Sequence, residues 1–285
     1  MGLRINSNIA AFNAYRNLQS TDKAQNSALE KLSSGLRINK AADDAAGLAI
    51  SENLRSQIGG LKVAVRNAQD GVNLVQTADG ALTEVHSILQ RMRDLAVQAS
   101  NGGTQTTESQ KAANEEFQEL AKELGDIAEK TAFGGKNLLD GTYNGSFQVG
   151  ANKGDFLDVS ISASTAASTS FDSAGLGVDG LTLNSTSVAL GVDSAQDALL
   201  AVGSAISAVS EARGKLGATQ NRLEHKINNL NVTIENVTAS ESAIRDTDMA
   251  EEMTRFTRSQ ILSQAGTSML AQANQSTQSV LSLLR

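Results

Sequence analysis

The sequence predicts a mainly α protein: an elongated helical bundle or coiled coil closed by both chain halves, with a small β-hairpin region and paired terminal helices. Three observations predict this fold. Apolar residues recur at spacings of three and four over residues 54–99, which is the heptad pattern of a coiled coil. A matching stripe runs over residues 199–237, so the two halves can bury each other's seams. The 285 residues include no proline, the residue that breaks helices.

Composition and charge exclude several classes of protein. The chain carries 24 basic and 31 acidic residues, a net charge of −7, whereas nucleic-acid-binding proteins show basic patches. It has no cysteine, which excludes disulfides, thiolate metal sites and cysteine nucleophiles. Its apolar runs are only a few residues long, and the amino terminus lacks the apolar core of a signal peptide, so we expect no membrane span and no Sec-type export.

The two ends of the chain form amphipathic segments. Breaks at residues 33–35 and 245–248 separate each end from the rest, although the spacing alone equally fits two additional bundle helices. Because such a pair is a poor free-standing domain, we expect it to order on assembly. The residues predicted to form this terminal assembly stripe are Ile5, Ile9, Phe12, Leu29 and Leu32 at the amino end and Met253, Phe256, Met269, Leu281 and Leu284 at the carboxy end.

The central elements follow from helix start and stop signals. A first long helix is expected from Asp44, as N-cap, to Ser100, followed by a glycine-containing stop. A second helix is expected from Thr107, with Gln110 completing a capping box. A third is expected from Ser194.

Between the second and third expected helices the amino-acid composition changes. Residues 147–149 and 156–161 predict two short strands that form a hairpin. Twelve of the 28 residues from 160 to 187 are Ser or Thr, which fits either a surface loop or a small β element. We expect this stretch to tolerate deletion and to accept sugars.

Catalytic chemistry finds little support in the sequence. His86 and His225 lie on different predicted helices beside glutamates, and a shared metal site is conceivable, but exposed helix positions explain them more simply. Glu115 and Glu116 resemble paired carboxylates but fit a solvated helix face. We therefore predict no enzyme activity, no cofactor and no catalytic or metal-binding residues.

Several motifs, in order along the chain, resemble bacterial flagellin. The resemblance covers nearly the whole chain; a shorter middle and Ser276-Thr277-Gln278, where the family often has proline, are departures. The matching stretches are residues 29–39 (LEKLSSGLRIN), 41–50 (AADDAAGLAI), 89–99 (LQRMRDLAVQA), 133–141 (FGGKNLLDG), 147–152 (FQVGAN), 221–225 (NRLEH), 261–266 (ILSQAG) and 269–275 (MLAQANQ).

The resemblance implies a structural subunit that assembles into the filament of the bacterial flagellum for motility. Residues 1–42 with 245–285 would line the filament channel, residues 43–160 with 192–244 would form a rod-like core, and residues 161–191 would be a surface-exposed variable segment. Export through the flagellar type III apparatus would make the subunit extracellular. Its partners would be further copies of itself, an export chaperone and the filament cap, without nucleic acid.

A host Toll-like receptor for flagellin is a further partner that the resemblance implies. The matching patch is Arg91, Leu95 and Glu115, with Arg91 and Leu95 four residues apart on one helix face. The same patch fits an axial contact between stacked subunits, which we expect to be its primary role.

Two other classes of function compete with a filament subunit. A hook-filament junction protein of the same superfamily resembles flagellin at its ends, but the motifs at 91–99 and 147–152 favour the filament subunit. A secreted enzyme with a zinc-peptidase-like variable region is disfavoured because residues 160–190 contain no histidine.

Overall fold

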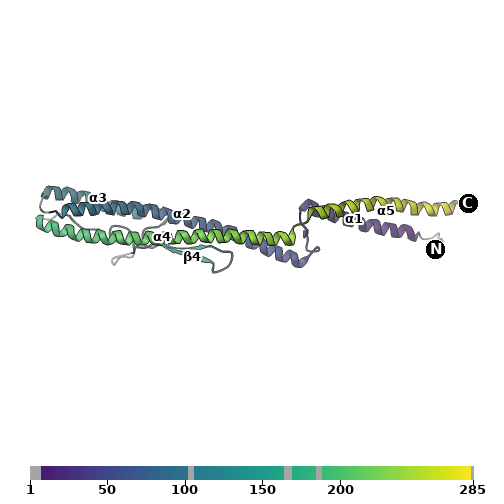
Figure 1. Ribbon diagram of the computed structural model, residues 1–285, viewed down its shortest axis with the longest axis horizontal. Coiled ribbons are helices and arrows are strands. Elements are labelled where there is room, and N and C mark those ends of the chain that lie inside the picture. The colour runs from purple at the N-terminus through teal and green to yellow at the C-terminus, as the bar shows by residue number, and fades with distance from the viewer. Residues whose placement is uncertain (1–7, 102–105, 164–168, 184–187, 284–285) are drawn as a thin grey trace. The chain divides into compact units, whose positions relative to one another are not determined.

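The computed structural model describes residues 8–101, 106–163, 169–183 and 188–283 (Figure 1). This part of the chain is mainly α-helical, which confirms the predicted fold class. Its elements are α1 (Ile9–Ser34), α2 (Ala45–Ala99), α3 (Thr107–Lys130), β1 (Ala132–Phe133), β2 (Lys136–Asn137), β3 (Asn144–Gln148), β4 (Phe156–Ser160), α4 (Val188–Arg245) and α5 (Met249–Leu283).

The chain divides into two compact units. Unit 1 combines Met1–Ile58 with Glu235–Arg285, and unit 2 is the continuous stretch Gly59–Ile234. Each of the long helices α2 and α4 has one part in unit 1 and the other part in unit 2. Unit 1 therefore contains the terminal helices α1 and α5 together with one end of α2 and of α4.

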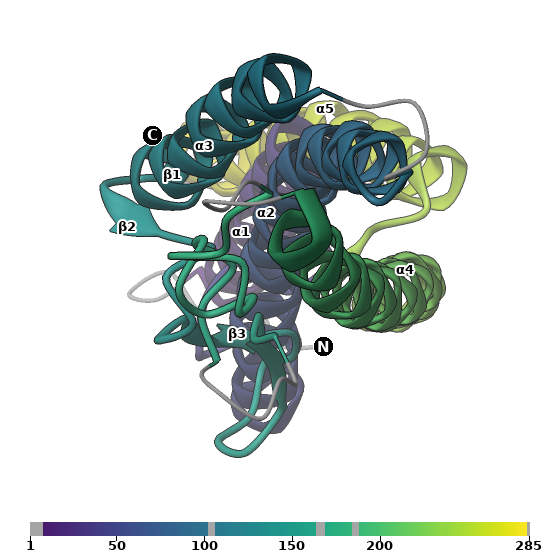
Figure 2. The ribbon, with the colours of Figure 1, turned by 90° about the vertical axis from the view of Figure 1, so that its left-hand side faces the viewer.

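Unit 2 is built on the heptad seams that the sequence predicts. Figure 2 views α2, α3 and α4 along their length, where they lie side by side. Their core includes Leu82, Leu89 and Phe117, all fully buried. Arg213 of α4 donates to Asp79 of α2 at 2.8 Å, an ion pair that fixes the register of these two helices. Burial of three facing seams explains why such long helices are stable here.

The predicted β-hairpin is confirmed. β3 and β4 pair antiparallel, with Asn144 opposite Ser160 and Gln148 opposite Phe156. The hairpin lies against α2, where the Asn67 side chain donates to the Gln148 carbonyl at 3.1 Å. A second, two-residue pairing of β1 with β2 was not predicted.

One capping box and one helix start differ from the sequence analysis. α3 begins at Thr107 as expected, but its capping box joins Thr106 and Ser109, so the role assigned to Gln110 is wrong. Gln110 is instead buried and donates to the Ala99 carbonyl at the end of α2, 3.1 Å away. α4 begins at Val188 rather than Ser194.

The segment expected at the surface contributes to the core of unit 2. In its described parts the segment buries Ile161, Phe171, Leu176, Val178 and Leu183, each at most 3% exposed. The Phe171 amide also donates to the Leu139 carbonyl at 2.9 Å. These apolar residues are scattered among many serines and threonines, so the composition alone did not reveal them. The described parts of the segment are therefore not wholly surface-exposed, as the sequence had suggested. Residues 164–168 and 184–187 lie outside the described residues.

Candidate assembly surfaces

The terminal helices α1 and α5 pack along each other in unit 1 through a seam of mostly small side chains. The least exposed positions follow a heptad pattern in both helices. A Cβ added at Gly266 would lie 3.2 Å from Leu18, so the helices approach closely there. The seam residues are Ala11, Ala14, Leu18, Thr21, Gln25 and Ala28 on α1, and Phe256, Ser259, Ser263, Gly266, Leu270 and Ala273 on α5.

Polar contacts fix the register of this pair. The Asn8 side chain caps α1 by accepting from the Ala11 amide, and it donates to the Ala273 carbonyl of α5 at 2.9 Å. The Ser263 hydroxyl donates to Asp22 at 3.1 Å. Going along α1, the partners on α5 come earlier in the chain, so the two helices are antiparallel, and side chains of both helices fix their register in addition to apolar burial.

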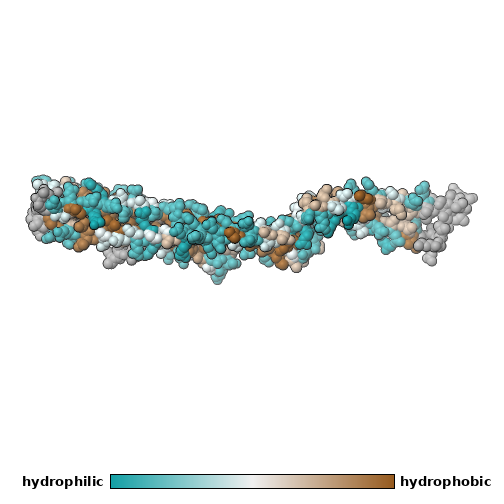
Figure 3. Space-filling model, in the orientation of Figure 1, coloured by the Kyte–Doolittle hydropathy of each residue, from teal (hydrophilic) through white to brown (hydrophobic). Residues whose placement is uncertain are grey.

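Large apolar side chains of the same two helices point away from the seam. Burying each such side chain is worth roughly 1.5–3 kcal/mol relative to leaving it exposed. Figure 3 shows hydrophobic patches on the surface of the terminal helices. The exposed residues, which we call the outward apolar set, are Ile9, Phe12, Tyr15, Leu29, Met253, Ile261, Leu262 and Met269, each 50% or more exposed.

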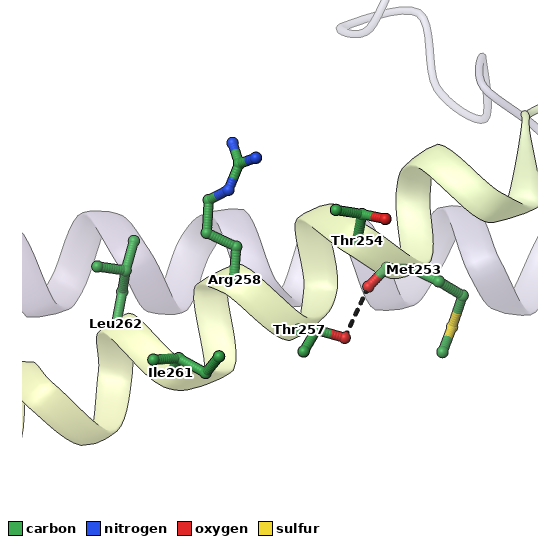
Figure 4. Close-up of a pocket in the computed structure, with 6 residues that line it drawn as sticks. All are labelled: Met253, Thr254, Thr257, Arg258, Ile261 and Leu262. Atoms are coloured by element: carbon green, nitrogen blue, oxygen red, sulfur yellow. Dashed lines mark hydrogen bonds between the residues drawn. The ribbon is translucent and has the colours of Figure 1, made fainter.

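Part of the outward apolar set lines a shallow hollow on α5 (Figure 4). Met253, Ile261 and Leu262 supply its apolar wall, and Thr254, Thr257 and Arg258 complete it. The Thr257 hydroxyl donates to the Met253 carbonyl at 2.9 Å, so this threonine presents its methyl group rather than an unpaired hydroxyl. The hollow can receive an apolar side chain from another molecule.

The predicted terminal assembly stripe coincides in part with this surface. Ile9, Phe12, Leu29, Met253 and Met269 are exposed, as an assembly surface requires. The remaining members are placed differently: Leu32 and Phe256 are half-buried, Ile5 and Leu284 lie outside the described residues, and the side chain of Leu281 is not described.

A buried arginine joins the two links that connect the terminal helices to the long helices. Arg245, 8% exposed, donates to Glu52 at 2.6 Å and lies 3.3 Å from the Ser51 hydroxyl. The Arg245 carbonyl accepts from the Arg37 amide at 2.6 Å, and the Thr247 amide donates to the Gly35 carbonyl at 3.0 Å. Sequence reasoning missed this network, because its residues are far apart in the chain and form no motif.

Carboxylates in and near these links have lowered pKa values. The hydrogen bond from Arg245 lowers the pKa of Glu52. Hydrogen bonds from Lys40 and Asn39 lower the pKa of Glu30, and backbone amides of the same two residues lower the pKa of Asp43. The α1–α2 link is therefore held by charged carboxylates.

In unit 2 the predicted patch of Arg91, Leu95 and Glu115 is divided between surface and core. Arg91 is exposed and binds Glu116 of α3 at 2.7 Å, which raises the pKa of its guanidinium. Glu115 is also exposed. Leu95, however, is 2% exposed and belongs to the core, so it is not the apolar anchor of a surface patch.

The two histidines give no sign of a shared metal site. His86 lies 3.0 Å from the Gln90 side chain on the same helix, and His225 lines a groove beside the hairpin. Among the described residues, no cluster of three or more His, Asp or Glu side chains is suited to hold a metal ion. Nor does the described part of the chain contain a helix of the length and apolarity needed to cross a membrane.

These features define a mainly α-helical protein whose terminal helices carry large exposed apolar side chains. The family model of the bacterial flagellin N-terminal helical region matches residues 5–144, and that of the C-terminal helical region matches residues 199–284. The chain therefore belongs to the bacterial flagellin family.

Full-length relatives agree with this assignment. The chain is 49% identical to a flagellin of Bacillus subtilis over 304 residues, covering 99% of this chain and 100% of the relative. It is 51% identical to a flagellin of Halalkalibacterium halodurans over 282 residues, covering 99% of each chain.

One solved structure supports a shared fold, and a second is reported for comparison. A Vibrio parahaemolyticus structure with the provisional name of flagellar hook-associated protein aligns with a TM-score of 0.59 at 15% identity, covering 72% of this chain and 100% of that one. At this identity the likeness concerns the fold alone. A Bacillus cereus flagellin crystal structure aligns with a TM-score of 0.49 at 30% identity, covering 58% of this chain and 88% of that one.

Proposed function

We propose that this chain is the structural subunit that assembles into the helical filament of the bacterial flagellum. The observation that carries the proposal is the outward apolar set on α1 and α5, whose members are 50% or more exposed in a single chain. Exposed apolar surface of this extent marks an interaction site. Neighbouring copies of the same chain would cover it in the filament, where the paired terminal helices line the channel.

The alternative of a hook-filament junction protein is less well supported. Both family models match this chain, and its relatives of about half identity over the full length are flagellins. The hook-associated structure resembles the chain only at 15% identity, which supports a common fold and no more.

Export and partners follow from the same proposal. The subunit is exported and becomes extracellular, with an export chaperone covering the apolar carboxy-terminal helix beforehand and the filament cap guiding its addition. It acts as a structural protein and not as an enzyme. A host Toll-like receptor remains a proposed partner, and Arg91 and Glu115 are the exposed members of the patch that it would contact.

Seeded polymerisation tests the proposal. The purified chain should extend short filament seeds into long tubes visible by electron microscopy, whereas a junction protein should not. Ile261→Ser with Met269→Ser should abolish extension, because each change replaces an exposed apolar contact by a hydroxyl. Ile261→Leu with Met269→Leu is the matched control and should extend seeds normally. Normal extension by the serine variant would contradict the role of the outward apolar set.

A further inference from the structure

The methionines of this chain are divided between core and surface. Four of its five methionines lie in the described part of the chain. Met92 is fully buried in the core of unit 2, whereas Met249, Met253 and Met269 of α5 are 48%, 50% and 64% exposed. The three exposed methionines therefore all lie on one helix of unit 1, and two of them belong to the outward apolar set.

The backbone of α5 holds the first two of these methionines at the surface. Met249 is the first residue of α5, and Asp248 caps this end of the helix by accepting from the Ala250 amide at 2.8 Å. Met253 follows four residues later, so the two thioethers lie on one face of the helix. Met253 also belongs to the wall of the hollow in Figure 4. A small oxidant in solution can therefore reach both sulfur atoms.

Met269 lines a second hollow, which lies where α1 and α5 meet. The α1 wall of this hollow includes Ala14 and Leu18, and its α5 wall includes Leu262. The next residue, Leu270, is half-buried in the seam, so α5 directs Met269 outward instead. A molecule that fills this hollow would bury the Met269 thioether among mostly apolar atoms.

Methionine is the most readily oxidised side chain here, because the chain has neither cysteine nor tryptophan. The sulfur lone pair attacks one oxygen of hydrogen peroxide, the O–O bond breaks, and the products are a sulfoxide and water. The sulfoxide is polar, and two thiols can reduce it back to the thioether, giving a disulfide and water. A buried sulfur is shielded from the oxidant, so Met92 serves as an internal reference.

We propose that Met249, Met253 and Met269 form an oxidation-sensitive site, at which a peroxide converts free subunits into a form that cannot join a filament. This inference rests on the proposed filament function. A sulfoxide oxygen needs water or a hydrogen-bond donor, and an apolar contact with a neighbouring copy supplies neither. Reduction of the sulfoxides returns the subunit to its assembling form, so the modification is reversible.

Seeded elongation by the oxidised chain tests this site. The free chain is treated with hydrogen peroxide, the excess is destroyed with catalase, and seeds are added only afterwards, so that free subunits alone are oxidised. Peptide mass spectrometry should find an added oxygen on Met249, Met253 and Met269 but not on Met92. The oxidised chain should elongate seeds at least about tenfold more slowly. Methionine sulfoxide reductases A and B, which reduce the two sulfoxide epimers, should restore the rate.

Leucine variants separate this site from general oxidative damage. Met249→Leu with Met253→Leu and Met269→Leu keeps apolar side chains that peroxide does not oxidise, so this variant should elongate equally before and after treatment. Met92→Leu should remain as sensitive as the unaltered chain. Equal loss of elongation by the treated triple variant and the treated unaltered chain would overturn the site.

Two further outcomes distinguish this site from the proposed function. Failure of the untreated, unaltered chain to elongate would refute the filament function itself. Normal elongation by a chain oxidised at all three methionines, or no recovery after their reduction, would overturn the oxidation-sensitive site while leaving the filament function intact.

Discussion

Arg245 shows how a single side chain holds parts of unit 1 together. It ends α4, is almost fully buried, and bonds to Ser51 and Glu52 near the start of α2. Its own carbonyl accepts from Arg37 in the link that follows α1. The charged hydrogen bond to Glu52 is of the stronger kind, because one partner is a guanidinium and the other a carboxylate.

The α1–α2 link should loosen in acid. The pKa of Glu52 is lowered in the folded chain, so its contribution to stability is complete above its ordinary value of 4.5 and is lost as the pH falls through the lowered value. Glu30 and Asp43 act with the same sign. The rate at which pepsin cuts within residues 35–44, divided at each pH by its rate on an unfolded reference peptide, should therefore increase as the pH falls from about 5 to about 2.

Glu52→Gln is the control for this residue. Near pH 5 the variant should be cut faster than the unaltered chain. As the pH falls further, its cutting should increase less, and the increase that remains should come from protonation of Glu30 and Asp43. Cutting in the link that is independent of both pH and this substitution would contradict the assigned role.

At the scale of elements, the sequence predicts those helices and strands whose positions are set by regularly spaced large apolar side chains. α2 and β4 follow from apolar spacing and were expected to within one residue at each end, whereas β3 begins three residues before the expected strand. The start of α4 was missed because Gly191 disfavours a helix locally, yet an added Cβ there would lie 2.8 Å from Gln110, so tertiary packing favours glycine. The seam of α1 and α5 was hidden because alanine, serine and glycine give no strong hydropathy signal.

The segment containing Phe171 gives a prediction at this scale. Phe171 is fully buried in the core of unit 2, so Phe171→Ala should destabilise the protein by about 3–5 kcal/mol. The exposed neighbour Asp179 is the control, and Asp179→Ala should change stability by no more than about 0.5 kcal/mol. Urea denaturation followed by circular dichroism measures both.

Deletion of residues 164–186 extends the same test. The composition suggested that this deletion would leave polymerisation intact, but it removes Phe171, Leu176, Val178 and Leu183 from the core. We now expect the deletion to destabilise unit 2 and to reduce the yield of filaments. A deletion variant as stable as the unaltered chain would show that these side chains are dispensable.

At the scale of the whole molecule, stability is unevenly distributed between the two units. Unit 2 buries large side chains such as Leu89, Phe117 and Leu124 completely. The α1–α5 pair of unit 1 buries mainly small side chains. Among the side chains of the pair that the structure describes, only Ala28 and Glu252 are buried. A helix pair with so little apolar burial has marginal stability in isolation, because helix formation depends on tertiary packing.

Hydrogen exchange should therefore distinguish the free chain from the filament. In the free chain, amides of α1 and α5 should exchange rapidly, while amides of α2 between Leu82 and Ala96 should be protected. In the filament, covering even two members of the outward apolar set gives roughly 3–6 kcal/mol, which corresponds to at least about a hundredfold slower exchange. The α2 amides should change far less and serve as the internal control. Equal protection of α1 and α5 in the two states would show that the terminal pair is already stable alone, and its exposed apolar side chains would then need another explanation.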